Sequence, residues 1–168
     1  LFDQKTGKRK TLGSKRERFG SAALSPDGNK VVTVRTDTEY KTRVVVLDLV
    51  SGNIVKEYPN PQNDFYSMPR WSYDGTRIAI LKTTTEGKTI TIIDSETENA
   101  TDVFPVSLEN FGHPLLVDEY LLFNSPVSGI DNIYALQLST NKRFQVTASK
   151  YGAYNPFVTE DGKTIYYN

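Results

Sequence analysis

Apolar and polar residues alternate along several short segments of this 168-residue chain, which is the pattern of half-buried β-strands. The clearest runs are residues 30–36 (KVVTVRT), 43–49 (RVVVLDL), 77–83 (RIAILKT) and 89–95 (TITIIDS). No window of about eleven or more residues places apolar side chains at the i, i+3, i+4, i+7 spacing of an amphipathic helix. The pattern therefore predicts an all-β fold.

A turn signal recurs between these runs, which indicates an internal repeat. Asp-Gly pairs begin at Asp27, Asp74 and Asp161, so that 47 residues separate the first two and 87 separate the second and third. Because the longer interval is about two repeats of roughly 45 residues, a degenerate copy is expected near residue 118. Residues 114–123 (PLLVDEYLLF) supply it, with Asp118-Glu119 at the turn.

Each repeat contains four predicted strands, and its length matches one blade of a β-propeller, in which four-stranded antiparallel sheets stand around a channel. The chain comprises three full blades flanked by two half-blades. Two interpretations stay open: the chain is a fragment of a larger ring, or its half-blades join to make a closed four-bladed ring. We predict one propeller domain over residues 1–168, with units at residues 1–19 (half-blade), 20–64, 65–110, 111–153 and 154–168 (half-blade).

The geometry of the Asp-Gly turns explains why the same residues recur in the repeat. In residues 71–75 (WSYDG), Asp74 can cap its own turn and Gly75 can adopt a positive φ. The tight hairpin fixes the register of the second strand, so that Ile78 and Ile80 face one side of the sheet. We expect Trp71, just before the turn, to pack between adjacent blades.

Composition limits the possible partners. The chain has 20 basic and 20 acidic residues, so it carries no net charge to attract a polyanion, and we expect no nucleic acid partner. No apolar run approaches the roughly 18 residues of a membrane helix, so we expect no membrane insertion. The basic segment at residues 5–18 is interpreted as a solvated sheet edge, with phosphate or anionic lipid as the alternative. Open blade edges leave self-association possible.

The segment at residues 69–75 (PRWSYDG), followed by an Ile-Ala-Ile strand, resembles the WD-repeat-like propeller repeat of the TolB family. Residues 128–168 resemble it most. Similar repeats form the non-catalytic propellers of prolyl oligopeptidase-type and tricorn-type peptidases. The resemblance covers essentially the whole chain and implies a propeller fold and a periplasmic or cell-envelope location in bacteria. The third unit departs from the pattern, because Asp118-Glu119 replaces Asp-Gly and Gln137 stands where other units have Asp.

Motifs for catalysis or cofactor binding do not stand out in the sequence. There is no Gly-x-Ser-x-Gly nucleophile elbow and no Gly-rich phosphate loop. With a single His, His113, and no Cys, a zinc site would need several carboxylates. We therefore expect no catalytic residues, no metal and no cofactor in this chain, and no enzyme activity.

Propeller topology indicates where a partner would bind, because two kinds of connection meet on one face: strand four to the next strand one, and strand two to strand three. Aromatic side chains beside polar groups in such loops suit protein or peptide recognition, although each ring could instead fill a gap between blades. The candidate loops are residues 36–42, 59–68, 105–113, 125–132 and 148–155. The candidate partner-binding residues are Tyr40, Asp64, Phe65, Tyr66, Phe111, His113, Asp131, Tyr151 and Tyr154.

Two functional hypotheses fit these observations. The first is a non-catalytic protein- or peptide-interaction module of TolB-like propeller type in the bacterial envelope. The alternative is a propeller domain that gates a prolyl oligopeptidase- or tricorn-type peptidase whose catalytic domain is absent from this chain. A third hypothesis, an enzyme acting on sugars or lactones in the channel, would need convergent acids or a metal on the inner strands.

Overall fold

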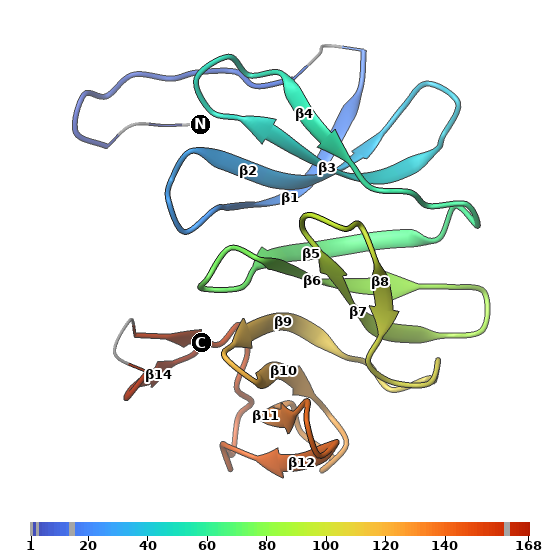
Figure 1. Cartoon of the computed structure of the whole chain (residues 1–168). Helices are drawn as coiled ribbons and strands as arrows, with labels where there is room; N and C mark the ends of the chain where they lie inside the picture. Colours follow the sequence, from blue (N-terminus) through green and yellow to red (C-terminus); the bar gives the residue numbers. More distant parts are fainter. Residues whose placement is uncertain (1, 3, 14–15, 160–161) are drawn as a thin grey trace.

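The computed structural model describes residues 2, 4–13, 16–159 and 162–168 (Figure 1). The strands of this part form three four-stranded antiparallel sheets and one two-stranded sheet, which confirms the predicted all-β class and its four-stranded blades. In these same ranges there is no helix of the length and apolarity needed to cross a membrane.

Consecutive strands form each sheet in chain order, as the hairpin turns predict. Blade 1 contains β1–β4, blade 2 contains β5–β8, blade 3 contains β9–β12, and β13 pairs with β14 in the C-terminal half-blade. The strands are β1 (Arg18–Leu24), β2 (Lys30–Thr36), β3 (Thr42–Asp48), β4 (Ile54–Glu57), β5 (Phe65–Trp71), β6 (Arg77–Thr83), β7 (Lys88–Asp94), β8 (Ala100–Asp102), β9 (Gly112–Val117), β10 (Tyr120–Ser125), β11 (Asn132–Gln137), β12 (Lys142–Gln145), β13 (Phe157–Val158) and β14 (Ile165–Tyr166).

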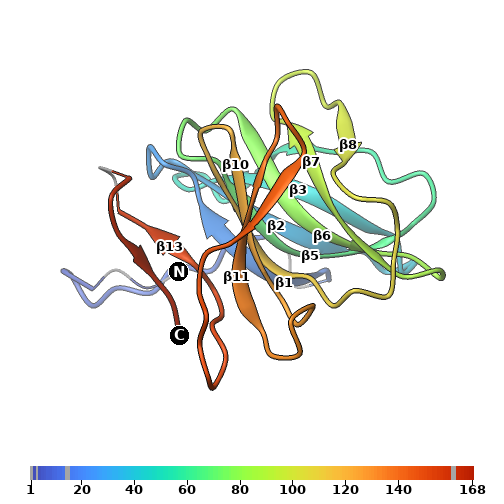
Figure 2. The ribbon, with the colours of Figure 1, turned by 90° about the horizontal axis from the view of Figure 1, so that it is seen from below.

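The hydrophobic core lies between neighbouring units, because both faces of each central strand carry apolar side chains. One cluster joins blade 1 to blade 2 and contains Val32, Ile80 and Trp71, which confirms that Trp71 packs between blades. A second cluster joins blades 2 and 3 around Phe123, and a third joins blade 3 to Val158 of the half-blade (Figure 2). Each fully buried Ile or Val contributes about 1.5–3 kcal/mol, so the blades stabilise one another.

The Asp-Gly turns have the predicted geometry where the structure describes them. Asp27 accepts a hydrogen bond from the Ser25 hydroxyl at 2.5 Å, and Gly28 has φ +70°. Asp74 accepts from the Ser72 hydroxyl at 2.5 Å, and Gly75 has φ +71°. Asp161, of the last predicted turn, lies outside the described residues. In the degenerate turn Asp118 itself adopts φ +52°.

A bulge interrupts the pairing of the first two strands in each of the three blades, and in blades 2 and 3 a residue with positive φ lies within it. Met68, His113 and Asn155 each precede a Pro and have φ values of +54°, +48° and +51°. The Met68 N–H donates to the Ser21 hydroxyl of blade 1 at 2.9 Å, and the His113 N–H donates to Sδ of Met68 at 3.4 Å. The bulges of blades 2 and 3 therefore each contact the preceding blade.

The two ends of the arc do not pair with each other in the described residues. The C-terminal half-blade has two strands, and the N-terminal segment forms an isolated bridge between Phe2 and Arg9. In Figure 1 the N-terminal segment lies beside blade 1, whereas the half-blade lies beside blade 3. Lys10 of the basic segment donates to the carbonyls of Leu49 and Val50 at the β3–β4 turn.

Candidate functional site

Connections between blades, together with the turns from second to third strands, form one side of the molecule, which we call the loop face. For blades 1 and 2 these connections project to the right in Figure 1, and the hairpins from first to second strands project to the left. The loop face comprises residues 37–41, 58–64, 84–87, 103–111, 126–131 and 146–156, with the strand residues that border them.

Exposed apolar side chains are frequent on the loop face. Four of the predicted aromatic residues are exposed there, and Tyr151 is 86% exposed. The sequence analysis did not identify four further exposed residues of this face, which appear in the sequence only as single apolar positions; Leu108 among them is 91% exposed. The eight exposed residues are Tyr40, Phe65, Leu108, Val127, Ile130, Val146, Tyr151 and Tyr154.

Tyr66 and Phe111 take the other role that the sequence left open, because both rings are buried between blades. Tyr66 packs in the cluster between blades 1 and 2, and burial raises the pKa of its hydroxyl to about 12. Phe111 stacks on Phe104 with ring centroids 4.8 Å apart and meets the edge of Phe123. We therefore assign these two residues to packing and not to the exposed recognition surface.

Two other predicted residues, His113 and Asp131, are connected through Asn124. The Asn124 side-chain amide donates to Asp131 Oδ1 at 2.8 Å, so its oxygen is left to accept from His113 Nδ1, also at 2.8 Å. This arrangement makes His113 Nδ1 the donor to the Asn124 side chain. Asn124 is only 5% exposed and sits within an apolar strand, so the sequence offered no sign of this role.

Asn60 and Asn63 fix the loop between blades 1 and 2. The Asn60 amide donates to the carbonyls of Thr42 at 2.7 Å and Asp64 at 2.9 Å. Asn63 accepts from the Thr42 N–H at 2.7 Å and donates to the Tyr40 carbonyl at 3.2 Å. The loops that carry the predicted residues Tyr40 and Asp64 are therefore joined to each other.

Glu109 and Arg143 fix the loop between blades 2 and 3. Arg143 donates to both Glu109 oxygens, at 3.1 and 2.6 Å, and Ser125 donates to the same carboxylate. Burial raises the pKa of Glu109, but the hydrogen bonds from Arg143 and Ser125 outweigh it and hold the pKa below its ordinary value. The guanidinium also lies 4.3 Å from the Tyr134 ring centroid, a favourable cation–π distance. Neighbouring Leu108 is thus presented from an anchored loop.

Tyr151 and Tyr154 lie on the last connection of the loop face. Tyr154 exchanges two backbone hydrogen bonds with Asn168, both of 3.0 Å. Its ring lies over Gly152, where an added Cβ would come within 2.7 Å of the ring. Tyr151 projects freely, with the Lys150 ammonium 5.5 Å from its ring centroid. Tyr154 is therefore held in place, whereas the side chain of Tyr151 is exposed to solvent.

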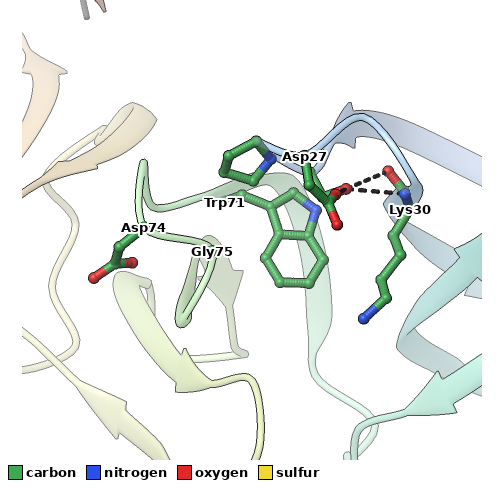
Figure 3. Close-up of a pocket in the computed structure, with 7 residues that line it drawn as sticks. Asp27, Lys30, Trp71, Asp74 and Gly75 are labelled. Carbon is green, nitrogen blue, oxygen red and sulfur yellow. Dashed lines mark hydrogen bonds between the residues drawn. The ribbon is translucent and has the colours of Figure 1, made fainter.

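On the opposite side, the hairpins form the hairpin face, which is hollowed along the boundary of blades 1 and 2. A hollow of about 210 Å³ lies between Asp27, Lys30, Trp71 and Gly75 (Figure 3). The sequence predicted only a structural role for these turns, that of fixing the register of the hairpins. Across the described ranges, no group of three or more His, Asp or Glu side chains is arranged to hold a metal ion.

Solved structures share this arrangement of blades. TolB from Acinetobacter baumannii superposes with a TM-score of 0.77 over 96% of this chain and 40% of its own length, at 19% identity. The chain has a TolB-like propeller fold. A puromycin-hydrolysing peptidase from Mycobacterium tuberculosis gives 0.66 over 88% of the chain and 27% of its own, at 20% identity. The propeller domain of the Trilobed protease from Pyrococcus furiosus, described as having an open velcro topology, gives 0.58 over 79% and 44%, at 19% identity.

These similarities establish the TolB-like propeller fold and leave the role of the chain open, because sequence identity is low and function resides in sites rather than folds. The chain spans less than half the length of each of these three structures. No family model matches the sequence, and no curated protein matches it.

Proposed function

We propose that this chain is a non-catalytic interaction module that binds a protein or peptide partner through its loop face. The observation that carries the proposal is the presence of eight exposed large apolar side chains in or beside the loops of that one face. Aromatic residues that project from a surface are the usual anchors of protein–protein interfaces, since each buries a large area at a small entropic cost.

The hydrogen bonds within the loop face support the same function. Because Asn60, Asn63 and Glu109 tie the loops together, little conformational freedom is lost when a partner docks. The Asp131 carbonyl accepts from the N–H of Ala153, next to Tyr154, so Asp131 supplies a polar group beside that exposed ring. Rigid apolar anchors with a polar surround are typical of a specific binding surface.

A bacterial periplasmic or cell-envelope setting is part of this proposal. Its support is the likeness to TolB of Acinetobacter baumannii, which is a likeness of fold. The setting is compatible with a chain that contains no Cys, since it needs neither reduced thiols nor disulfides.

The fold similarity to the puromycin-hydrolysing peptidase and the Trilobed protease favours a second candidate, a propeller that gates a peptidase domain. The full-length gene separates the two candidates. A Gly-x-Ser-x-Gly elbow followed by Asp and His beyond this chain would favour the peptidase. Further blades or an envelope-anchoring domain would favour the interaction module.

Site-specific photocrosslinking tests the loop face in cells that express the full-length protein. A photoreactive phenylalanine at Tyr151 should give a covalent product with a partner, and one at Tyr120, the exposed first residue of β10 at the hairpin face, should not. With the photoreactive residue at Tyr40 instead, Tyr151→Ala combined with Tyr154→Ala should abolish the product and leave the melting temperature nearly unchanged. Equal products from both positions, or a large loss of stability in the double variant, would refute the proposal.

A further inference from the structure

Three adjoining hollows meet at Trp71 on the hairpin face and form what we call the Trp71 groove. Their volumes are about 210, 420 and 240 Å³, and Trp71 lines all three. The hollow of about 210 Å³ lies in the middle. It shares Lys30 and Gly75 with the outer hollow of about 420 Å³ and Pro26 with the inner hollow of about 240 Å³. The groove therefore extends along the boundary of blades 1 and 2, from the innermost strands to the outer strand β4.

The only polar atom of the Trp71 side chain has no partner. Its Nε1–H is buried and lacks a hydrogen-bond acceptor, and the residue as a whole is 8% exposed. Figure 3 shows the nitrogen-bearing edge of the indole turned toward the hairpin of Asp27 and Lys30. The other buried nitrogens without acceptors in the described residues belong to Arg35 and Arg143, whose guanidinium groups are paired through their remaining nitrogens.

A buried donor without an acceptor destabilises a fold and calls for an explanation. Trp71 lies against the three hollows, so an acceptor supplied from the groove would satisfy it. Since Nε1 is itself covered, the hairpin of residues 25–30 must shift outward as the acceptor enters. A ligand that binds here would therefore change the environment of Trp71 directly.

The charges around the groove favour an uncharged acceptor over a carboxylate. The backbone of Lys30 is hydrogen-bonded to Ser25, but its ammonium makes no hydrogen bond or salt bridge with the described residues and adds a second open donor. Lys56 is already engaged with the carbonyls of Ser95 and Glu96. The acids Asp27, Asp48, Asp74 and Glu96 also line the hollows, so acidic residues outnumber the basic ones there, which are the two lysines and Arg70. An anionic group would be repelled, whereas an amide carbonyl would not.

The ends of the groove are apolar. Leu24 and Phe157, both about half exposed, line the inner hollow, and Val55, also about half exposed, lines the outer one. Apolar ends on either side of open donors match an extended peptide, which carries carbonyls along its main chain and side chains at regular intervals. We propose that the Trp71 groove binds an uncharged, extended peptide segment of another protein, with a main-chain carbonyl accepting from Trp71 Nε1.

The single Trp of the chain makes a direct test possible, because its indole N–H gives one isolated signal in a ¹⁵N-labelled spectrum. The probe is a library of N-acetylated, C-amidated heptapeptides without charged residues, selected on the immobilised full chain. Titration with the tightest peptide should move the indole proton downfield to saturation and leave the Tyr151 amide signal in place. A shift at Tyr151 without one at the indole would overturn the groove and favour the loop face.

Two variants separate the contacts. Trp71→Phe keeps an aromatic ring and deletes the donor, so it should weaken binding about threefold to tenfold. Lys30→Met should weaken binding about threefold, whereas Lys142→Met, on β12 of blade 3, should not change it. Lys30→Met decides the question if Trp71→Phe fails to fold.

Three outcomes would contradict the proposal. One is unchanged affinity in both Trp71→Phe and Lys30→Met. Another is tighter binding of a peptide in which the central residue is Asp, which would indicate an anionic ligand. The third is an indole signal that moves when the protein alone is concentrated, which would indicate that a second copy occupies the groove. None of these outcomes bears on partner binding at the loop face.

Discussion

Tyr73, in the turn between β5 and β6, holds Val158 of β13 through both of its backbone groups. The Tyr73 hydroxyl donates to the Val158 carbonyl and accepts from the Val158 N–H at 3.2 Å. The two residues are 85 positions apart, so this pair fastens the C-terminal half-blade to blade 2 across the inner side of the arc. The Tyr73 hydroxyl thus pairs with backbone groups of β13 that a neighbouring strand would otherwise pair with.

Removing this hydroxyl should loosen the half-blade before the rest of the fold. Tyr73→Phe deletes two hydrogen bonds and should lower the free energy of unfolding by about 1–2 kcal/mol. Hydrogen exchange should accelerate at the Val158 amide far more than at Val45 of β3. Tyr120→Phe, at the exposed first residue of β10, is the control. It should change neither the free energy of unfolding nor the exchange rates of the two amides. Equal acceleration at both amides would show that the half-blade unfolds only with the whole domain.

A side chain at the glycine of the Asp-Gly turn in blade 2 should destabilise the fold. Gly75 has φ +71°, a conformation that costs a residue with a Cβ about 1–2 kcal/mol. Gly75→Ala should therefore lower the free energy of unfolding in urea by about that amount. Gly20→Ala is the matched control, because its φ is ordinary and the added Cβ would make only normal contacts with Val34 at 3.7 Å. Equal effects of the two substitutions would rule out a special role for φ at Gly75.

The ion pair of Glu109 and Arg143 should make stability depend on pH. Because the folded-state pKa of Glu109 is held below its unfolded value of about 4.3, the stabilisation is present above that pH. It is lost as the pH falls through the folded-state pKa. Glu109→Gln should cost about 1–2 kcal/mol at neutral pH, and the difference from the unmodified chain should shrink below about pH 4. A difference for Glu109→Gln that stays constant across this pH range would exclude the pKa effect.

Much of the fold could be predicted because its signals are local. Alternation of apolar residues, the Asp-Gly turns and the spacing of the repeat each depend on a few adjacent positions, and Gly28 and Gly75 have the positive φ that the turns require. The network of His113, Asn124 and Asp131 depends on side chains that meet only after the bulge of the first strand has formed. Sequence spacing therefore identified two of its members and not the one between them.

The bulge in β5 explains why burial was harder to predict than strand position. Tyr66 and Trp71 are five positions apart, so an uninterrupted strand would turn them to opposite faces. Both rings lie in the same cluster, because the pairing with β6 shifts between Ser67 and Arg70. The shift buries Tyr66 and leaves Phe65 in solvent. Alternation gives the period of a strand, but the phase on either side of a bulge depends on tertiary pairing.

Two phenylalanines from the same predicted surface should therefore respond oppositely to truncation. Phe111 is buried against Phe104 and Phe123, so Phe111→Ala should lower the free energy of unfolding by about 3–5 kcal/mol. Phe65 is mostly exposed, so Phe65→Ala should cost well under about 1 kcal/mol and should instead weaken the crosslinked complex formed at Tyr151. Urea denaturation and crosslink yield measure the two effects separately. A large loss of stability for Phe65→Ala would mean that its ring packs within the blades and is not part of the loop face.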